Sequence, residues 1–420
     1  MTMPLIGNAA LMRMAMSNVD LAPLGKQLLA RAAADAQDAN ALMDMSMVLQ
    51  LSGQRELALA MQRQALEIQL LYHLPASCAT SGEATKTCIR LLAFMTPGDL
   101  MTNTPLDCLI ENGDVALDTL YLGAGLAPPL ELPEHDLLFI AIGASDRNAP
   151  LLAELAEVTR NWPRPVLNLP EHTALTSREG ACARLRGAPG IAMPATVRMA
   201  RETLAGIGRG ELPLAEALDD GVFPIIARPI DTHAGQGLVK IDAPAGIAAF
   251  LEGAPDAEFH VSRFIDYSGA DGQFRKYRIV LIDGRPYACH MGISRDWMIH
   301  YLNAGMAESA EKRAEEARFM SGFDEDFAPR HTTAFAAIQA RMQLDYLIID
   351  CAETRDGELL IFEVDTGAVV HAMDPVDLFP YKQPQMQKVF AAFRAMLGAA
   401  RDRDRGYGHC SMAAPEHAEQ

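Results

Sequence analysis

Cysteine patterns typical of zinc sites and of disulfide frameworks are missing from this sequence of 420 residues. Its seven cysteines include no CxxC pair, so neither a structural zinc site nor a disulfide framework is indicated. Basic residues are scarce: 36 Lys and Arg stand against 54 Asp and Glu, for a net charge of −18. Because nucleic acids and anionic membranes attract basic surfaces, this balance argues against nonspecific binding to either. No run of about 20 apolar residues is present, so no transmembrane span is expected.

The beginning of the sequence also lacks the features of a secretory signal. Residues 1–20 are rich in Met but contain neither a long apolar run nor a clean cleavage site. An odd number of cysteines fits a reducing compartment. We therefore expect a cytoplasmic protein, and its length is sufficient for two or three domains.

Helical periodicity dominates residues 1–80, which predict a helical domain. Its second half has a turn at Ser52-Gly53 and small residues at Ala58 and Ala65, and it resembles a single tetratricopeptide repeat. One repeat cannot bury its apolar face alone, so we expect it to pack on the next domain or on another subunit. An ordinary helical hairpin is an equal alternative.

Strands and helices alternate between residues 88 and 170. The segments IRLLAFM and HDLLFIAIGASD are typical of buried strands, and the second is followed by a helix that begins near Asn148. This alternation predicts a small open α/β domain over 88–170. A larger domain of strands and helices follows over 171–397. The polar residues 400–420 predict a disordered tail.

A hairpin is predicted between Asp345 and Gly367. Asp356-Gly357 stands between two apolar runs, which is a strong signal for a two-residue turn. That turn pairs Cys351 with Phe362. One face of the hairpin is then apolar and suited to a core, with Ile349, Cys351, Leu360, Phe362 and Val364.

Three carboxylates lie on the other face of this predicted hairpin. Asp350 is placed opposite Glu363, and Asp365 points to the same side. Like charges that face each other in a sheet repel, so a cation is expected among them. Carboxylate oxygens suit Mg²⁺ or Mn²⁺. The alternative is an exposed acidic face without a ligand.

A loop with glycines and several basic residues precede the hairpin. The strand FPIIARP leads into a loop with Gly235 and Gly237, and such loops can bring backbone N–H groups to phosphates, although most are simple turns. Basic side chains cluster around the loop and on a later strand: Arg228, Lys240, Arg275, Lys276 and Arg278. Phosphates, basic residues and magnesium together indicate phosphoryl transfer from a nucleotide.

The order and spacing of these features resemble the ATP-grasp superfamily, which includes D-alanine–D-alanine ligase, glutathione synthetase and the ribosomal-protein glutamate ligases. Asp350, Glu363 and Asp365 are similar to its D…ExN magnesium set. The segments FPIIARPIDTHAGQGLVKI and FRKYRIVLIDGRP are similar to its strand–glycine loop–strand and its strand pair. The resemblance covers about 88–397. It implies an α/β (α+β) fold in which a small open α/β pre-ATP-grasp domain precedes the ATP-grasp domain.

The sequence departs from the family pattern at three positions. Arg228 stands where a nucleotide-binding Lys is usual, which keeps the charge but changes its shape. Asp365 replaces the usual Asn and adds a negative charge at the metals. Ser262 stands where a Glu is common. Ile348 takes the place of an Arg of D-alanine–D-alanine ligase, which disfavours D-alanine ligation itself.

The resemblance implies an ATP-dependent ligase. A substrate carboxylate would attack the γ-phosphate of ATP, and an amine or another nucleophile would displace phosphate from the acyl phosphate. The implied metal ligands for Mg²⁺, or alternatively Mn²⁺, are Asp350, Glu363 and Asp365, and the catalytic cations are Arg228, Lys276 and Arg278. The implied nucleotide contacts are Arg178, Arg184, Arg228, His233, Gly235, Gly237, Val261, Phe264, Ile265 and Asp271.

The segment 289–306 is dense in polar and aromatic residues, which suggests a substrate site. Arg295 could bind a carboxylate with two hydrogen bonds, and His300 or His290 could accept a proton from the attacking group. The alternative is a packing segment with Trp297 in the core. Small-molecule or peptide acids and amines are therefore the expected partners.

A second hypothesis belongs to a different class. The chain could be a catalytically weak ATP-binding adaptor that holds a partner through its N-terminal helices. A homodimer through those helices is also open, whereas no nucleic-acid or membrane partner is expected. The sequence does not identify the acid or the nucleophile.

Overall fold

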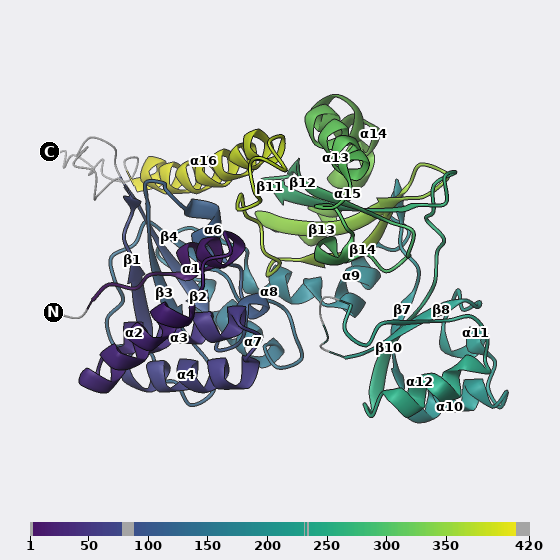
Figure 1. Ribbon diagram of the computed structural model, residues 1–420, viewed down its shortest axis with the longest axis horizontal. Helices are drawn as coiled ribbons and strands as arrows, with labels where there is room; N and C mark the ends of the chain where they lie inside the picture. The colour runs from purple at the N-terminus through teal and green to yellow at the C-terminus, as the bar shows by residue number, and fades with distance from the viewer. Residues whose placement is uncertain (1–2, 78–87, 231, 233–234, 409–420) are drawn as a thin grey trace, which may run out of the picture.

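The computed structural model describes residues 3–77, 88–230, 232 and 235–408, and for residues 404–408 it describes the backbone alone. Three sheets and the helices around them make up the molecule (Figure 1). A small α/β part comes first and two mainly antiparallel sheets follow, so the predicted α/β class is confirmed. In the described residues, no helix is long and apolar enough to cross a membrane.

The first sheet has five strands in the order β1-β3-β2-β4-β5. β2 pairs in parallel with β3 and β4, and β4 pairs in parallel with β5, whereas β1 is an antiparallel edge strand. β4 is buried along its whole length, as expected for a parallel strand with both faces covered. The strands are β1 (Leu71–Leu74), β2 (Ile89–Met95), β3 (Val115–Tyr121), β4 (Leu137–Ile140) and β5 (Val166–Leu167).

Helices cover both faces of the first sheet. α7 packs on the face with Leu92 and Leu138, and α3, α4 and α16 pack on the face with Leu91 and Phe139. The helices here are α1 (Asn8–Met16), α2 (Ala22–Ala34), α3 (Ala39–Leu51), α4 (Arg55–Ile68), α6 (Leu106–Ile110) and α7 (Ala149–Thr159), with a 3₁₀ turn η1 (Leu100–Thr102).

The predicted turn between two N-terminal helices lies between α3 and α4, where Gly53 has a φ of +75°. Ala58 and Ala65 are fully buried, as small residues at a close helix contact should be. The apolar side of this helix pair does not face solvent, because Leu42 and Leu66 share one core with the strands of the first sheet. The predicted regions 1–80 and 88–170 are therefore joined by a common core.

The second sheet has the order β7-β10-β8-β9 and is antiparallel. Its strands are β7 (Thr196–Ala200), β8 (Ile225–Pro229), β9 (Val239–Ile241) and β10 (Glu258–Arg263). Helices α10 (Arg201–Gly208), α11 (Leu214–Ala217) and α12 (Gly246–Gly253) lie beside it at the lower right of Figure 1. This part has its own core around the fully buried Phe259.

The third sheet has the order β12-β11-β13-β14-β6. Alternate residues face opposite sides: Ile279 and Ile349 contact helices α13 and α15, whereas Val280 and Ile348 contact α16. Its strands are β6 (Ile191–Ala192), β11 (Phe274–Ile282), β12 (Arg285–Ser294), β13 (Tyr346–Glu353) and β14 (Leu359–Asp365). The remaining helices are α8 (Pro170–Thr173), α9 (Arg178–Leu185), α13 (Ala310–Gly322), α14 (Ala328–Arg330), α15 (Thr332–Met342) and α16 (Lys382–Gly408).

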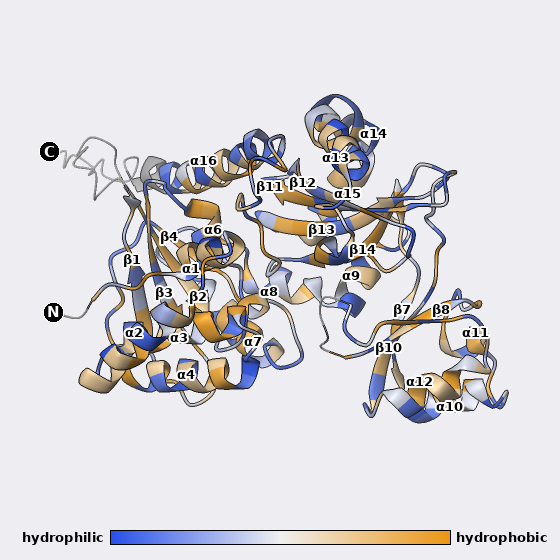
Figure 2. Ribbon diagram, viewed as in Figure 1, coloured by the Kyte–Doolittle hydropathy of each residue, from blue (hydrophilic) through white to orange (hydrophobic). Residues whose placement is uncertain are grey.

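The long helix α16 joins the first and third sheets. Figure 1 shows this helix along the top of the molecule. Phe393 packs on Phe139 of β4 and on Tyr346 of β13. Hydrophobic residues follow the strands that α16 covers, whereas the outer helices carry both hydrophobic and hydrophilic residues (Figure 2). The helix continues to Gly408, so the disordered tail predicted from residue 400 is wrong for 400–408, and residues 409–420 lie outside the described part.

Two Asp-Gly turns behave differently. At Asp283-Gly284 both residues have positive φ, 49° and 75°, and Ile282 pairs with Arg285, as a two-residue hairpin turn requires. At Asp356-Gly357 the prediction of a two-residue turn is wrong. The Thr354 N–H donates to the Glu358 carbonyl at 2.9 Å, which leaves three residues in the loop.

The extra loop residue shifts the hairpin register by one, and a β-bulge shifts it back. Cys351 pairs with Ile361 rather than with the predicted Phe362, but beyond the bulge Asp350 pairs with Glu363 as predicted. Leu360 and Phe362 therefore leave the predicted core face and line a cavity on the other side.

The charged helix α13 is not exposed to solvent on all sides. Glu316 and Met320 are fully buried beneath this helix. The buried side of this helix is not evident from its charge pattern, because one of the buried residues is itself a carboxylate.

Candidate functional site

A cavity of about 680 Å³ lies between the second and third sheets and reaches α1 in the first part. The cavity lies on the same face of the third sheet as α16, but at a different point along the strands. α16 covers apolar residues of β11 and β13, and beyond α16 these strands carry polar residues that face the cavity. Twelve of the predicted site residues line the cavity: Arg178, Arg228, Gly235, Phe264, Ile265, Lys276, Arg278, His290, His300, Asp350, Glu363 and Asp365.

Several predicted residues do not reach the cavity. Arg184 is exposed, and its carbonyl accepts a hydrogen bond from Arg341 at 2.8 Å. Arg295 is exposed beyond the end of β12. Asp271 is exposed and bound to Arg275 at 2.8 Å. These three were selected for their charge, but none of them lines the cavity.

Two nucleotide contacts, which were expected on β10 and near the glycine loop, have other surroundings. Val261 is fully buried in the core of the second sheet, and as part of a central strand it pairs with Val197 and Ala227. Gly237 has a φ of +67°, and a Cβ there would lie 2.8 Å from Pro229 Cδ, so its glycine serves the turn. His233 lies outside the described residues.

Asp350 is the most buried acid of the predicted metal set, with an exposed fraction of 5%. Strand pairing puts Arg278 beside it, and the guanidinium donates to both carboxylate oxygens at 2.8 and 3.0 Å. Lys276 Nζ lies 2.7 Å from Asp350 Oδ2. Burial opposes ionisation, but Arg278 and Lys276 outweigh it and hold the pKa of Asp350 well below its ordinary value.

Glu363 and Asp365 lie next to Asp350 on β14. Arg178 at the start of α9 places Nη2 3.2 Å from Glu363 Oε2. Burial again opposes ionisation, and Arg178 lowers the pKa of Glu363 against it. Asp365 Oδ1 accepts the Gly367 N–H at 2.9 Å. Both carboxylates are therefore held in place from outside β14.

The donor types of these three acids fit a hard divalent cation, since each supplies carboxylate oxygen. Their present partners are cations and a backbone amide. Accordingly, in the described part of the chain no group of three or more His, Cys, Asp or Glu side chains is arranged to hold a metal ion. A metal at Asp350 and Glu363 would share these carboxylates with Lys276, Arg278 and Arg178.

Arg228 lies across the cavity on β8 and is 7% exposed. Its guanidinium donates to the hydroxyl of Thr232 at 3.1 Å and to the Thr232 carbonyl. Burial and, secondly, the charge of Arg178 lower the pKa of Arg228 to about 10. The group stays charged at neutral pH and lacks a carboxylate within ion-pair distance among the described residues, so it is suited to bind an anion.

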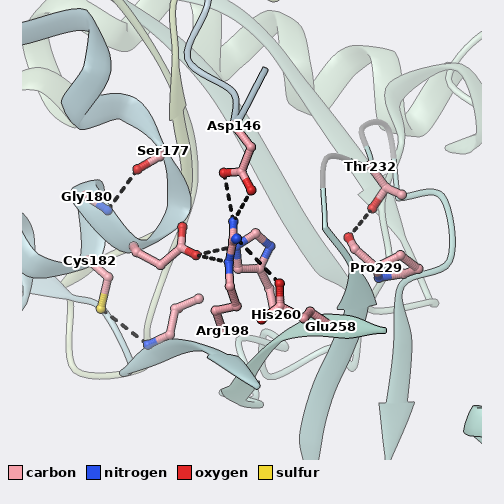
Figure 3. A network of polar contacts seen from close by, with 11 residues as sticks. Asp146, Ser177, Gly180, Cys182, Arg198, Pro229, Thr232, Glu258 and His260 are labelled. Atoms are coloured by element: carbon pink, nitrogen blue, oxygen red, sulfur yellow. Dashed lines mark hydrogen bonds and ion pairs between the residues drawn. The ribbon is translucent and has the colours of Figure 1, made fainter. Parts of the chain in front are cut away.

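Sequence analysis missed a network around Arg198 (Figure 3). Its guanidinium contacts both oxygens of Asp146 at 2.7 and 2.8 Å, Glu179 at 3.2 Å and Glu258 at 3.6 Å. His260 Nε2 lies 3.0 Å from Glu179. Because Asp146 follows β4 and Arg198 belongs to β7, this network connects the first part to the second sheet at the cavity edge.

Sequence analysis also missed a buried cluster at the other end of the cavity. Lys382 is 3% exposed, lies 3.2 Å from Asp374 Oδ1, and donates to the hydroxyl of Tyr301. The fully buried Glu316 accepts from Tyr301 at 2.9 Å and from Tyr381 at 2.6 Å. These residues lie up to 81 positions apart in the sequence, and only the polar, aromatic segment around Tyr301 gave any signal.

Two histidines line the same end of the cavity. Burial and the charges of Arg278 and Lys382 hold the pKa of His290 well below its ordinary value. Burial, Lys276 and Arg278 lower the pKa of His300. Both imidazoles are therefore neutral at pH 7 and able to accept a proton. The His290 ring also packs on Tyr301 with centroids 4.3 Å apart.

Comparison with known proteins gives structural likeness alone. No family model and no curated protein matches the sequence. The VanG D-Ala:D-Ser ligase of Enterococcus faecalis is 14% identical, with 74% of this chain and 100% of that chain covered and a TM-score of 0.46. D-alanyl-alanine synthetase A of Vibrio cholerae is 14% identical, with 76% and 100% covered and a TM-score of 0.48.

A RimK domain ATP-grasp protein from Sphaerobacter thermophilus is also similar, at 15% identity. The match covers 72% of this chain and 98% of that chain, with a TM-score of 0.39. The activities in these names are those of the matched proteins.

Proposed function

We propose that this chain is an ATP-dependent ligase that activates a carboxylate as an acyl phosphate and joins it to an amine. The observation that carries the proposal is the convergence of basic and acidic residues on one cavity. Arg228 approaches from the second sheet and Arg178 from the start of α9, and Lys276 and Arg278 lie beside Asp350 on the third sheet. Four cations at one site suit the charge of a triphosphate.

The described residues suggest a role for each side of the cavity. Arg228, Lys276 and Arg278 would neutralise the transferring phosphoryl group, and Phe264 and Ile265 would lie at the adenine. Asp350, Glu363 and Asp365 would hold Mg²⁺, which supplies charge neutralisation at the phosphates when bound. His300 or His290, neutral at pH 7, would take the proton that the attacking amine loses.

Product formation tests the ligase directly. The enzyme is incubated with Mg²⁺, ATP and a panel of carboxylates and amines, and ADP and phosphate are measured. Equal amounts of both should form when an acid and an amine are present together. Because loss of one charge-stabilising group commonly costs about 100-fold or more in rate, Lys276→Met and Arg228→Met should be at least that impaired. Exposed Lys26 provides the matched control Lys26→Met.

One observation favours the adaptor alternative. Asp350 and Glu363 of the predicted metal set are already paired with cations of the chain itself, and the described residues present no preformed metal group. An adaptor that binds ATP without turnover needs no such group. Saturable ATP binding in equilibrium dialysis, with no ADP from any pair of substrates, would favour the adaptor over the ligase.

A further inference from the structure

The end of the cavity nearest the first part is lined by methionines. Met12 and Met16 of α1 and Met101 of η1 lie there beside Val369 and Val370. Met12 and Val369 belong to one apolar cluster. Methionine side chains are flexible and polarisable, so a wall of them adapts to apolar groups of different shape. None of these methionines has a role in the function proposed above.

α1 is fixed firmly in its place against the cavity. The buried carboxylate of Asp44 accepts the Ile6 N–H at 3.0 Å and the Gly7 N–H at 3.2 Å just before the helix begins. Asp107 Oδ2 accepts the Ala9 N–H at 2.8 Å. These contacts satisfy backbone donors that a helix start otherwise leaves open. The methionine wall is therefore built into the fold.

This wall is continuous with the proposed reaction centre. Arg278, which holds Asp350, also donates from Nη1 to the Val369 carbonyl at 3.4 Å. Between the acids and Val369, the chain passes so close to η1 that a Cβ on Gly367 would lie 2.6 Å from the Met101 carbonyl oxygen. A carboxylate that reacts beside Arg278 therefore has the methionine wall next to the rest of its molecule.

We propose that the acid substrate carries a flexible apolar chain, and that Met12, Met16 and Met101 receive it. This inference rests on the proposed ligase function and adds the class of acid that the site selects. Arg278 and Lys276 favour the carboxylate, and the wall favours the carbon chain. Each methylene buried there should strengthen binding about fourfold.

Straight-chain acids test the proposal, with acetate, butanoate and hexanoate as probes and hydroxylamine as the nucleophile. The carboxylate oxygen bonds to the γ-phosphorus and ADP leaves. The hydroxylamine nitrogen then bonds to the carbonyl carbon and gives up a proton to His300 or His290, and phosphate leaves. The hydroxamate product is measured for each acid. A second readout, the shift in Tm produced by each acid with Mg²⁺ and ADP, needs no turnover.

Variants of α1 test whether the methionines cause the dependence on the chain length of the acid. Met16→Gln places an amide of similar size in the wall, and Met16→Leu keeps it apolar. Met14→Gln is the matched control, because Met14 is on the same helix and half-buried but does not line the cavity. From acetate to hexanoate, kcat/KM and the Tm shift should rise steeply in the wild type, in Met14→Gln and in Met16→Leu. In Met16→Gln the ratio of kcat/KM for hexanoate to kcat/KM for acetate should be at least tenfold smaller than in the wild type, and the Tm shift should grow less with chain length.

The outcomes separate this inference from the proposed function. Hydroxamate from every acid with no dependence on chain length would overturn the methionine wall and leave the ligase standing. A Tm shift that grows with chain length without any hydroxamate would support the wall and contradict the ligase. The wall is also overturned if Met14→Gln flattens the response as much as Met16→Gln.

Discussion

At the scale of single residues, the acids of the hairpin are defined by their partners. Asp350 is bound by Arg278 and Lys276, and Glu363 by Arg178. The sequence predicts these acids on one face with a cation among them, but that cation was expected to be Mg²⁺ or Mn²⁺ rather than side chains of the chain itself. The register of β11 on β13, which brings Arg278 beside Asp350, depends on tertiary pairing and is not encoded in the local spacing.

Replacement of these acids should separate turnover from folding. Asp350→Asn and Glu363→Gln should abolish Mg²⁺-dependent ADP formation, while Asp365→Asn should be milder because an amide oxygen can still ligate a metal. Circular dichroism should show that all three variants fold. Asp219→Asn, at an exposed ion pair with Arg186, is the control and should keep full activity. Full activity in both Asp350→Asn and Glu363→Gln would remove the metal assignment.

The low pKa of Asp350 predicts how stability depends on pH. The unfolded carboxyl takes a proton near pH 4, whereas the folded one stays ionised to lower pH. The stabilisation is therefore complete above about pH 4 and is lost as the pH falls toward the folded pKa. Urea unfolding between pH 3 and 6 should show that the free energy of unfolding of the wild type exceeds that of Asp350→Asn by an amount that shrinks as the pH falls. A difference that stays constant would contradict the depressed pKa.

At the scale of elements, local patterns predicted strands and helices well but not their connections. The buried strand β4, the two-residue turn at Asp283-Gly284 and the helix that begins after Asn148 follow the sequence signals. The Asp356-Gly357 turn does not, because nothing local distinguishes two loop residues from three. The correct pairing of Asp350 with Glu363 depended on a bulge that was not foreseen.

Gly367 provides a test at this scale. A side chain there meets the backbone of Met101 rather than a flexible side-chain end, so η1 or the segment after β14 must move. Gly367→Ala should cost about 1–3 kcal/mol of stability, as overpacking does, and should raise the KM of the acid. Gly322→Ala, with open space around its Cβ position, should change neither. Denaturation and kinetics of the two variants provide the comparison.

At the scale of the whole molecule, three parts surround one cavity. α16 joins the first and third sheets through a shared apolar core, whereas the second sheet has a separate core and meets the first part through the polar Arg198 network. The parts can be predicted from the pattern of hydrophobic residues along the sequence. The charged residues that connect them cannot, since Asp146 and Arg198 are 52 positions apart.

Arg198→Ala should loosen the second sheet without unfolding the protein. The ion pairs are partly exposed, so the loss of global stability should stay within about 1 kcal/mol. The KM for ATP should rise, because Arg228 on the second sheet would no longer be held opposite Asp350. Raised salt should increase the KM for ATP by a larger factor in the wild type than in the variant, because in the wild type it also weakens this network. An unchanged KM for ATP would show that the network does not position the second sheet.

Oxygen transfer tests the central claim most directly. The enzyme is given Mg²⁺, ATP, hydroxylamine and hexanoate labelled with ¹⁸O in its carboxylate, and the released phosphate is analysed by mass spectrometry. An acyl phosphate predicts one ¹⁸O atom in each phosphate, since the carboxylate oxygen that attacked phosphorus leaves with it. Phosphate without label, or no phosphate at all with this or any other acid that the panel identifies, would contradict the proposed ligase.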